Sequence, residues 1–153
     1  MENVKNDTAD RELVITRTIN APVELVWEIW TKPEHIANWW GPDGFTNTIT
    51  KMDVRAGGKW ELTMHGPDGT DYPNRSIFKE IVPFKKIVYE HISVPHILAT
   101  ISFEKQGGQT NIHWHMLFDS REDFIGVIKK HKADVGLKQN LAKMIVYLEN
   151  FPK

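Results

Sequence analysis

The sequence predicts a single α+β domain in which a long C-terminal helix packs across a curved antiparallel sheet. Strand-like segments follow one another at short spacing between residues 45 and 118, which favours antiparallel pairing. An apolar stripe at helical spacing runs from about residue 134 to the end. The length of 153 residues suits one core. We expect residues 12–153 to form this domain and the polar residues 1–11 to form a mobile tail.

The N-terminal part of the chain predicts a strand followed by two helices. Residues 12–20 are rich in β-branched residues, which favours a strand. Pro22 suits the first position of a helix, and Pro33 ends that helix and begins a second, short one. Gly41-Pro42 stops the second helix. The first helix has one apolar face, which consists of Val23, Val26, Trp27 and Trp30.

Turn signals divide the middle of the chain into about six strands. Residues 66–69, which read Gly-Pro-Asp-Gly, separate two strand-like segments and are typical of a hairpin. The other breaks stand at Gly57-Gly58, Pro83, Pro95 and Gly107-Gly108. With residues 12–20 this gives about seven strands. Helices and strands do not alternate along the chain, which argues against a parallel sheet.

The C-terminal part predicts two helices. Ser120 is a favourable N-cap, and Asp123 stands at the capping-box position three residues later. The final helix carries an apolar stripe about four turns long, at positions Leu137, Leu141, Met144, Ile145 and Leu148.

Composition excludes several classes of protein. The chain has no cysteine, which rules out disulfides, thiolate zinc sites and cysteine nucleophiles. No apolar run is long enough to cross a bilayer, and the N-terminus lacks the features of a signal peptide. The 19 basic and 20 acidic residues give a net charge of −1. We therefore expect no nucleic-acid partner, no membrane partner and a cytoplasmic location.

Alternation along the strands predicts an inner face that is rich in aromatic and methionine side chains. Such a face can fill a core or line a cavity, and alternation alone does not decide between the two. We expect the final helix to cover the face that carries Trp60, Leu62, Met64, Ile101, Trp114 and Met116.

Two histidines have a spacing that could bind a metal. His113 and His115 lie two residues apart on a predicted strand and therefore share a face. That face is opposite to the face of Trp114, and no acidic residue at a suitable position completes a site. We expect both imidazoles to face solvent, and we expect neither a metal nor a cofactor.

Three segments, taken together, resemble one known family. They read INAPVELVWEIWTKPEHIANWWGP, DVRAGGKWELTMHGPDG and NRSIFKEIVPFKKIVYE. In this order they closely resemble the family named after the activator of Hsp90 ATPase homologue 1, in the START-like or Bet v 1-like (SRPBCC) superfamily, over roughly residues 12–150. The resemblance implies a helix-grip fold with a cavity between the sheet and the C-terminal helix. Related domains bind hydrophobic ligands, some act as polyketide cyclases, and the family includes a co-chaperone domain.

The predicted strand around Phe78 and Glu80 has no clean alternation. The family pattern implies that both side chains face inward, which would make Glu80 a buried carboxylate in need of a partner. Arg17 shares the strand face of Ile15 and Ile19 and is a candidate partner. A structural ion pair and a ligand contact remain two alternatives for Glu80.

Three functions remain open. The first is non-catalytic binding of a small hydrophobic molecule in the cavity. The second is a cyclase- or dehydratase-type enzyme for a polyketide-like or aromatic substrate, in which Glu80, with Tyr72, Tyr89 or His91, would supply acid–base function. The third is a protein-interaction module with a chaperone partner, as in the Hsp90 activator. For the first function the predicted ligand contacts are Trp40, Trp60, Leu62, Met64, Phe78, Glu80, Tyr89, Ile101, Trp114, Met116, Leu141 and Met144.

Overall fold

A computed structural model of the chain describes residues 9–93 and 96–151. Within this part, seven strands form one antiparallel sheet in the order β1-β7-β6-β5-β4-β3-β2. In chain order the elements are the 3-10 helix η2 (Ala9–Arg11), β1 (Glu12–Ile19), α1 (Val23–Thr31), α2 (Pro33–Trp39), β2 (Thr46–Met52), β3 (Lys59–His65), β4 (Asp71–Val82), β5 (Lys86–His91), β6 (Ile97–Gln106), β7 (Gln109–Phe118), α3 (Arg121–His131) and α4 (Ala133–Glu149).

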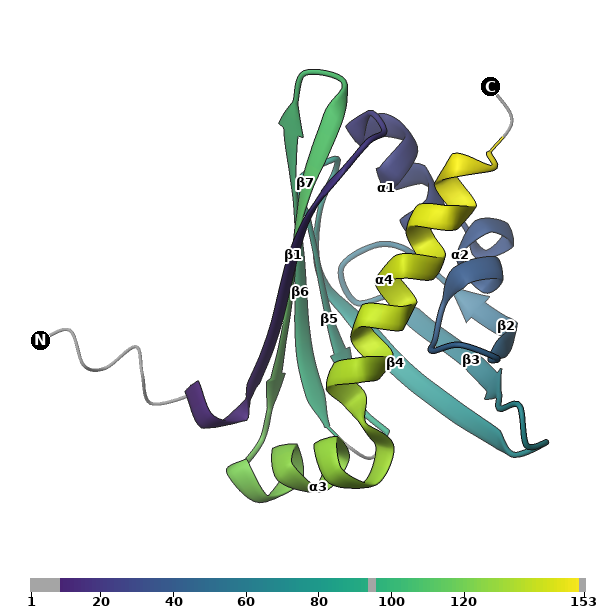
Figure 1. Cartoon of the computed structure of the whole chain (residues 1–153), viewed down its shortest axis with the longest axis vertical. Coiled ribbons are helices and arrows are strands. Elements are labelled where there is room, and N and C mark those ends of the chain that lie inside the picture. The colour runs from purple at the N-terminus through teal and green to yellow at the C-terminus, as the bar shows by residue number, and fades with distance from the viewer. Residues whose placement is uncertain (1–8, 94–95, 152–153) are drawn as a thin grey trace, which may run out of the picture.

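The helices lie on one side of the sheet. α4 crosses the inner face of the sheet, α1 and α2 lie on the same side, and α3 lies at one end (Figure 1). This arrangement confirms the predicted α+β helix-grip fold. Among the described residues, no helix is both long enough and apolar enough to cross a bilayer.

The residues that the sequence predicts to begin or end helices lie at the observed helix ends. α1 ends at Thr31 because Pro33 cannot continue it, and α2 begins at Pro33 itself. The hydroxyl of Ser120 accepts a hydrogen bond from the backbone N–H of Asp123 at 3.0 Å, which confirms the predicted cap of α3.

The predicted apolar stripe of α4 is its buried face. Leu137, Leu141, Met144 and Leu148 are all buried there. Three polar contacts join α4 to other parts of the domain. The indole N–H of Trp30 donates to the sulfur of Met144, the Lys143 ammonium donates to the carbonyl of Pro42, and the Tyr147 hydroxyl bonds the His35 ring.

The turn between β2 and β3 requires glycine at position 58. The N–H of Gly58 donates to the carbonyl of Arg55 at 2.8 Å, and its own carbonyl accepts from the N–H of Phe78 at 2.9 Å. A Cβ atom at this position would lie inside the contact distance of the carbonyl oxygen of Asp53. Only a residue without a side chain therefore fits, which gives a reason for the predicted Gly57-Gly58 turn.

The residues just before β1 form a short 3-10 turn. Residues 1–8 of the predicted mobile tail lie outside the described residues. Residues 9–11 form a single 3-10 turn, and the guanidinium of Arg11 donates to the carbonyls of Phe118 and Asp119 at 2.8 and 3.1 Å. The residues just before β1 thus contact the end of β7.

Candidate functional site

The inner face of the sheet carries a continuous cluster of aromatic rings. Trp30 of α1 contacts the rings of Trp39 and Trp114, each with centroids 4.9 Å apart. Trp40 stacks on Trp114 at 5.6 Å and meets Trp60 edge-on at 5.0 Å. We call the aromatic core the set Trp30, Trp39, Trp40, Trp60, Phe78, Tyr89 and Trp114, all of which are buried. Edge-on and offset contacts of this kind add to the stabilisation that burial alone provides.

The structure brings together eleven of the twelve predicted ligand contacts. Met64 and Met116 are half-buried and line the inner face. The other nine are buried, and they are Trp40, Trp60, Leu62, Phe78, Tyr89, Ile101, Trp114, Leu141 and Met144. Strand alternation therefore identified the inner face, although it did not identify how closely its side chains pack.

Glu80 is the exception, and the prediction that it faces inward is wrong. A β-bulge interrupts the pairing of β4 with β5, because Phe78 pairs with Tyr89 whereas Glu80 pairs with Val88. Lys79 is the extra residue, so the alternation shifts after Phe78 and Glu80 turns to the outer face. There its carboxylate pairs with the Lys86 ammonium at 3.1 Å, and the side chain is half exposed. Arg17, its predicted partner, is exposed and donates instead to the carbonyl of Thr16.

Two indole N–H groups in the aromatic core have no acceptor among the described residues. These are the Nε1 atoms of Trp60 and Trp114, and the two side chains are only 2% and 1% exposed. In contrast, Trp30 donates to the Met144 sulfur at 3.3 Å, and Trp39 donates to the carbonyl of Ile29 at 3.2 Å. Buried donors are almost always paired, so two unpaired indoles in one cluster need an explanation.

A third unpartnered polar atom lies on the helix that covers this face. Asn140 is 7% exposed on α4, one turn before Met144, and its side-chain oxygen has no partner among the described residues. The side-chain oxygen of Asn47 is also buried without a partner, so the described residues hold two free donors and two free acceptors. Asn140 was missed by sequence reasoning, although a polar residue beside Leu141 in an apolar stripe is a visible signal.

In the part of the chain that the structure describes, no Asp, Glu, His or Lys side chain is fully buried. Among the described residues, the buried polar side chains are Ser76, Thr110 and Asn140, together with the tyrosine Tyr89. Burial raises the pKa of the Tyr89 hydroxyl well above its usual value, so this group stays protonated at neutral pH.

Of the other residues named for acid–base chemistry, only His91 shares the face of Tyr89, two residues further along β5. Glu80 faces outward, Tyr72 is exposed, and the His91 ring bonds the Asn74 side chain at 2.6 Å.

Two hollows of the described surface lie outside the aromatic core. One, of about 540 Å³, lies between the start of α1, the β4–β5 turn and the end of β6. Another, of about 220 Å³, lies between the end of β1 and the last turns of α4. None of the twelve predicted contacts lines either of them. A molecule that enters between the stacked rings of Trp40 and Trp114 must displace side chains.

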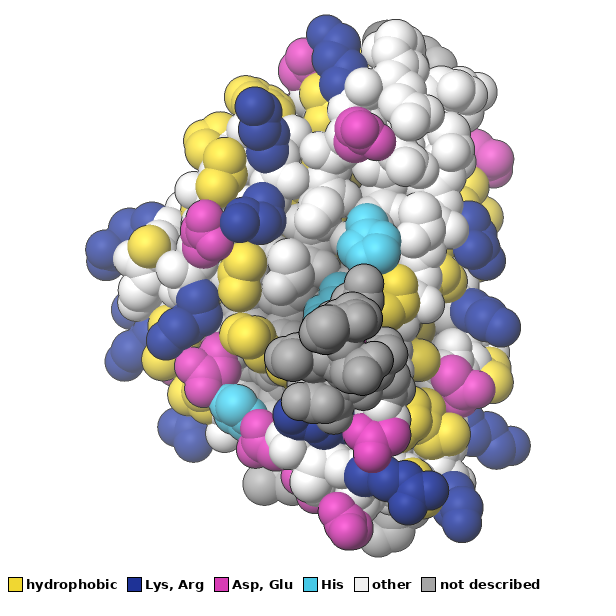
Figure 2. All heavy atoms as spheres, turned by 90° about the vertical axis from the view of Figure 1, so that its left-hand side faces the viewer, with side chains coloured by type: hydrophobic (Ala, Val, Ile, Leu, Met, Phe, Trp, Pro, Cys, Tyr) yellow, Lys and Arg dark blue, Asp and Glu magenta, His cyan; other side chains and the backbone are white. Residues whose placement is uncertain are grey.

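The outer face of the sheet carries histidines and charges of both signs (Figure 2). The His113 ring bonds the Thr16 hydroxyl at 3.0 Å, and His115 bonds the Glu12 carboxylate at 2.9 Å. Both rings lie on the face opposite to Trp114, which confirms that they point away from the core. Within residues 9–93 and 96–151, no group of three or more metal-binding side chains is close enough to hold an ion.

His96 connects two carboxylates at one end of the sheet. Its Nε2 lies 2.6 Å from a Glu90 oxygen, and its Nδ1 lies 2.7 Å from an Asp119 oxygen. Hydrogen bonds to Glu90 and Asp119 raise the pKa of His96, and the bond from His96 lowers the pKa of Glu90. The Lys79 ammonium, 3.4 Å from Glu90, lowers the pKa of that carboxyl further.

This cluster predicts that stability depends on pH. The His96 contribution is complete below its ordinary pKa of 6.5 and is lost as the pH rises through the raised value. The Glu90 contribution is complete above its ordinary pKa of 4.5 and is lost as the pH falls through the lowered value. In urea unfolding, His96→Gln should therefore cost about 0.2–1 kcal/mol at mildly acidic pH, as exposed ion pairs do, and less in alkaline buffer. His113→Gln is the control, and an equal pH dependence in both variants would contradict the assignment.

Comparison with known proteins gives a family and a set of neighbours in fold. The sequence pattern of the family described as "Activator of Hsp90 ATPase homolog 1-like protein" matches residues 20–149. No curated protein matches the chain.

Solved structures match over nearly the whole chain. A protein from Arthrobacter aurescens superposes with a TM-score of 0.86 at 22% identity, over 96% of this chain and 91% of that one. Protein Ms6760 from Mycobacterium smegmatis superposes with a TM-score of 0.82 at 20% identity, over 97% and 96%. DynU16, a protein from the dynemicin biosynthetic locus, superposes with a TM-score of 0.69 at 14% identity, over 92% of this chain and 48% of that one. At these identities the likeness shows a shared fold.

Proposed function

The chain belongs to the family of activator of Hsp90 ATPase homologue 1-like proteins, and on this basis we propose that it binds a small hydrophobic molecule between the sheet and α4 without transforming it. The observation that carries the proposal is the pair of unpartnered indole N–H groups of Trp60 and Trp114. A ligand with a carbonyl or ether oxygen would give these donors an acceptor. The rest of its surface would contact aromatic and methionine side chains.

The energetics favour a ligand with a hydrogen-bond acceptor over a plain hydrocarbon. An unsatisfied buried donor costs about 1–3 kcal/mol relative to a paired one. A ligand oxygen that reaches one of the two indoles recovers part of that cost, whereas a hydrocarbon of the same shape recovers none. The free side-chain oxygen of Asn140 adds a place for a donor on the ligand.

Methionine side chains offer a way in for the ligand. Met64 and Met116 are half-buried at the border of the aromatic core, and their unbranched side chains change conformation at low cost. Opening the core in this way costs free energy, which lowers the apparent affinity in proportion to the population of the open state. We therefore place the dissociation constant in the micromolar range, which corresponds to about 8 kcal/mol of binding free energy.

The position of the titratable groups supports binding over catalysis. An acid–base mechanism needs a group near its working pKa within hydrogen-bond reach of the substrate. Glu80 is on the outer face, and the Tyr89 hydroxyl holds its proton because burial raises its pKa.

A matched pair of compounds tests the proposal. 9-Fluorenone carries a carbonyl oxygen, and fluorene has a CH₂ group in its place. We expect fluorenone to quench tryptophan emission saturably and to bind about fivefold more tightly than fluorene, because one hydrogen bond contributes on the order of 1 kcal/mol. Trp60→Phe or Trp114→Phe should reduce this preference severalfold, because each removes a free donor.

Trp39→Phe is the matched control, because the Trp39 N–H already donates to the carbonyl of Ile29 and should not take part. Native mass spectrometry of freshly purified protein provides an independent readout, since a bound small molecule adds mass. If neither compound gives a saturable signal and only bare protein is observed, the proposal fails. The aromatic core is then purely structural, and a protein-interaction role takes its place.

A further inference from the structure

The β4–β5 turn holds a phenylalanine where a turn of its type favours glycine. The N–H of Lys85 donates to the carbonyl of Val82 at 2.9 Å, and Pro83 and Phe84 are the two central residues. Phe84 has a φ of +64°, and Pro83 restricts its own φ to negative values, so the turn is of type II. A left-handed conformation costs a residue with a side chain about 1–2 kcal/mol. Backbone strain at a single position of this kind is a recognised sign of function.

The strained residue displays its ring at the surface. Phe84 is 46% exposed and contacts the ring of Trp27, with centroids 5.8 Å apart. Trp27 in turn meets Phe103 edge-on at 5.3 Å. The turn therefore places the Phe84 ring beside Trp27. About half of the Phe84 side chain remains open to a partner.

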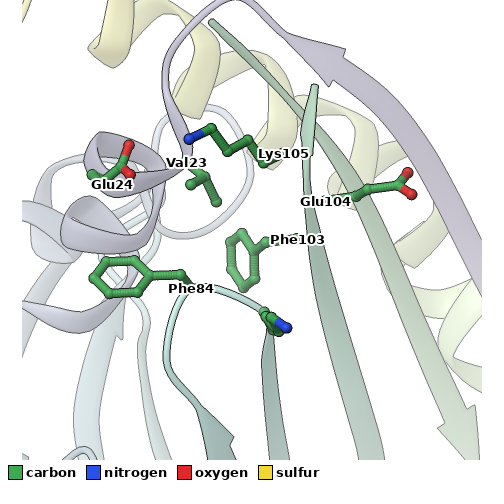
Figure 3. A pocket seen from close by; sticks show the side chains of 7 residues that line it. Val23, Glu24, Phe84, Phe103, Glu104 and Lys105 are labelled. Atoms are coloured by element: carbon green, nitrogen blue, oxygen red, sulfur yellow. The ribbon is translucent and has the colours of Figure 1, made fainter. Parts of the chain in front are cut away.

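Phe84 and Phe103 are two walls of the larger surface hollow. Figure 3 shows both rings turned toward this hollow, with Val23 of α1 beside them. The volume of about 540 Å³ lies in the range of sites for small molecules. Phe103 is 5% exposed and contacts Trp30 at 5.9 Å, so its ring separates the hollow from the aromatic core. The hollow is thus distinct from the interior site.

The charges around the hollow favour an anion. Lys85 and Lys105 are exposed, and neither forms an ion pair within the described residues. Glu24, at the start of α1, carries the opposing charge. Glu104 also borders the hollow, but its carboxylate points away from it (Figure 3). Two lysines without ion pairs among the described residues thus border the hollow, and the Glu24 carboxylate opposes them.

We propose that this hollow binds a small aromatic anion, a carboxylate or sulfonate on a flat ring system. The ring would lie against Phe84 and Phe103, and the anionic group would lie within reach of the Lys105 or Lys85 ammonium. Ring contacts supply apolar burial with a preferred geometry, and the ammonium groups supply the selectivity for charge. This site is independent of the interior site proposed above.

Two fluorescent probes of one shape test the proposal. 8-Anilinonaphthalene-1-sulfonate is the aromatic anion, and N-phenyl-1-naphthylamine is its neutral counterpart. We expect the anion to bind with a stoichiometry near one and at least fivefold more tightly than the neutral probe. Phe84→Gly should weaken the anion at least fivefold and still fold, because glycine suits this turn position. Lys105→Gln and Lys85→Gln together should remove the preference for the anion.

Two controls separate this site from the interior site. Trp114→Phe should leave the sulfonate affinity within twofold of the parent, because the indole lies beyond Phe103. Lys138→Gln, on the exposed side of α4, should also leave it unchanged. If Phe84→Gly binds the sulfonate like the parent, or if the neutral probe binds equally well, the proposal is overturned. Neither result affects the fluorenone experiment, in which the Trp60→Phe and Trp114→Phe variants assign the preference for fluorenone to the aromatic core.

Discussion

Replacing Leu141 with alanine should lower the free energy of unfolding by about 2–5 kcal/mol, the range observed for buried leucines. Leu141 is 1% exposed and lies in the middle of the buried stripe of α4. Its neighbours cannot collapse into the space freely, because the bond between Trp30 and Met144 holds α4 at a fixed distance from α1. The cavity should therefore persist, and its cost adds to the lost transfer free energy.

Urea unfolding followed by circular dichroism measures this loss. Val146→Ala is the matched control on the same helix, since Val146 is 53% exposed and its truncation should change stability by less than about 0.5 kcal/mol. If Leu141→Ala were as mild as Val146→Ala, α4 would be peripheral and would not be the element that closes the inner face.

Gly58→Ala should destabilise the protein by about 3 kcal/mol, because the added methyl group meets backbone and not a movable side chain. The obstacle is the carbonyl of Asp53, and the same turn also holds the hydrogen bond between Gly58 and Phe78. Relief of the clash requires the β2–β3 turn to shift, which pulls on the pairing of β3 with β4.

Gly57→Ala separates the clash from ordinary backbone strain. Gly57 has a φ of +86°, but a Cβ atom there meets nothing within 4 Å. Its substitution should therefore cost only the conformational penalty of about 1–2 kcal/mol. Thermal and urea unfolding of the two variants measure the difference. An equal loss in both would show that the carbonyl of Asp53 does not obstruct a side chain at position 58.

Most of the fold could be predicted because its signals are local. Pro33 and Ser120 mark helix ends through their own geometry and hydrogen bonding, and glycines and prolines separate the strands. The bulge at Lys79 could not be predicted in this way. It depends on how β4 pairs with β5, and one extra residue in that pairing turned Glu80 from the inner to the outer face.

The sequence predicted which residues make up the candidate site, but it did not predict which of their polar groups form hydrogen bonds. Alternation placed Trp60 and Trp114 on the inner face, yet which indole finds an acceptor depends on residues far away in the chain. Trp30, for example, donates to Met144, which is 114 residues away. The Phe84 turn carried a readable signal, since Pro83 is followed by a bulky residue at a position that favours glycine. That signal indicates backbone strain at Phe84, but it does not indicate which residues the Phe84 ring contacts.

The strand order determines when each part of the sheet can form during synthesis. Strands β2 to β7 pair with their sequence neighbours, so each can add to the sheet soon after it leaves the ribosome. β1 is made first but pairs with β7, and Ile15 must wait for Trp114. At the usual elongation rate of about 5–20 residues per second, that delay is on the order of 5–20 s. A nascent chain that stops before β7 therefore exposes β1 and the edge of β6 together, and unpaired edges of this kind are where chains associate with one another.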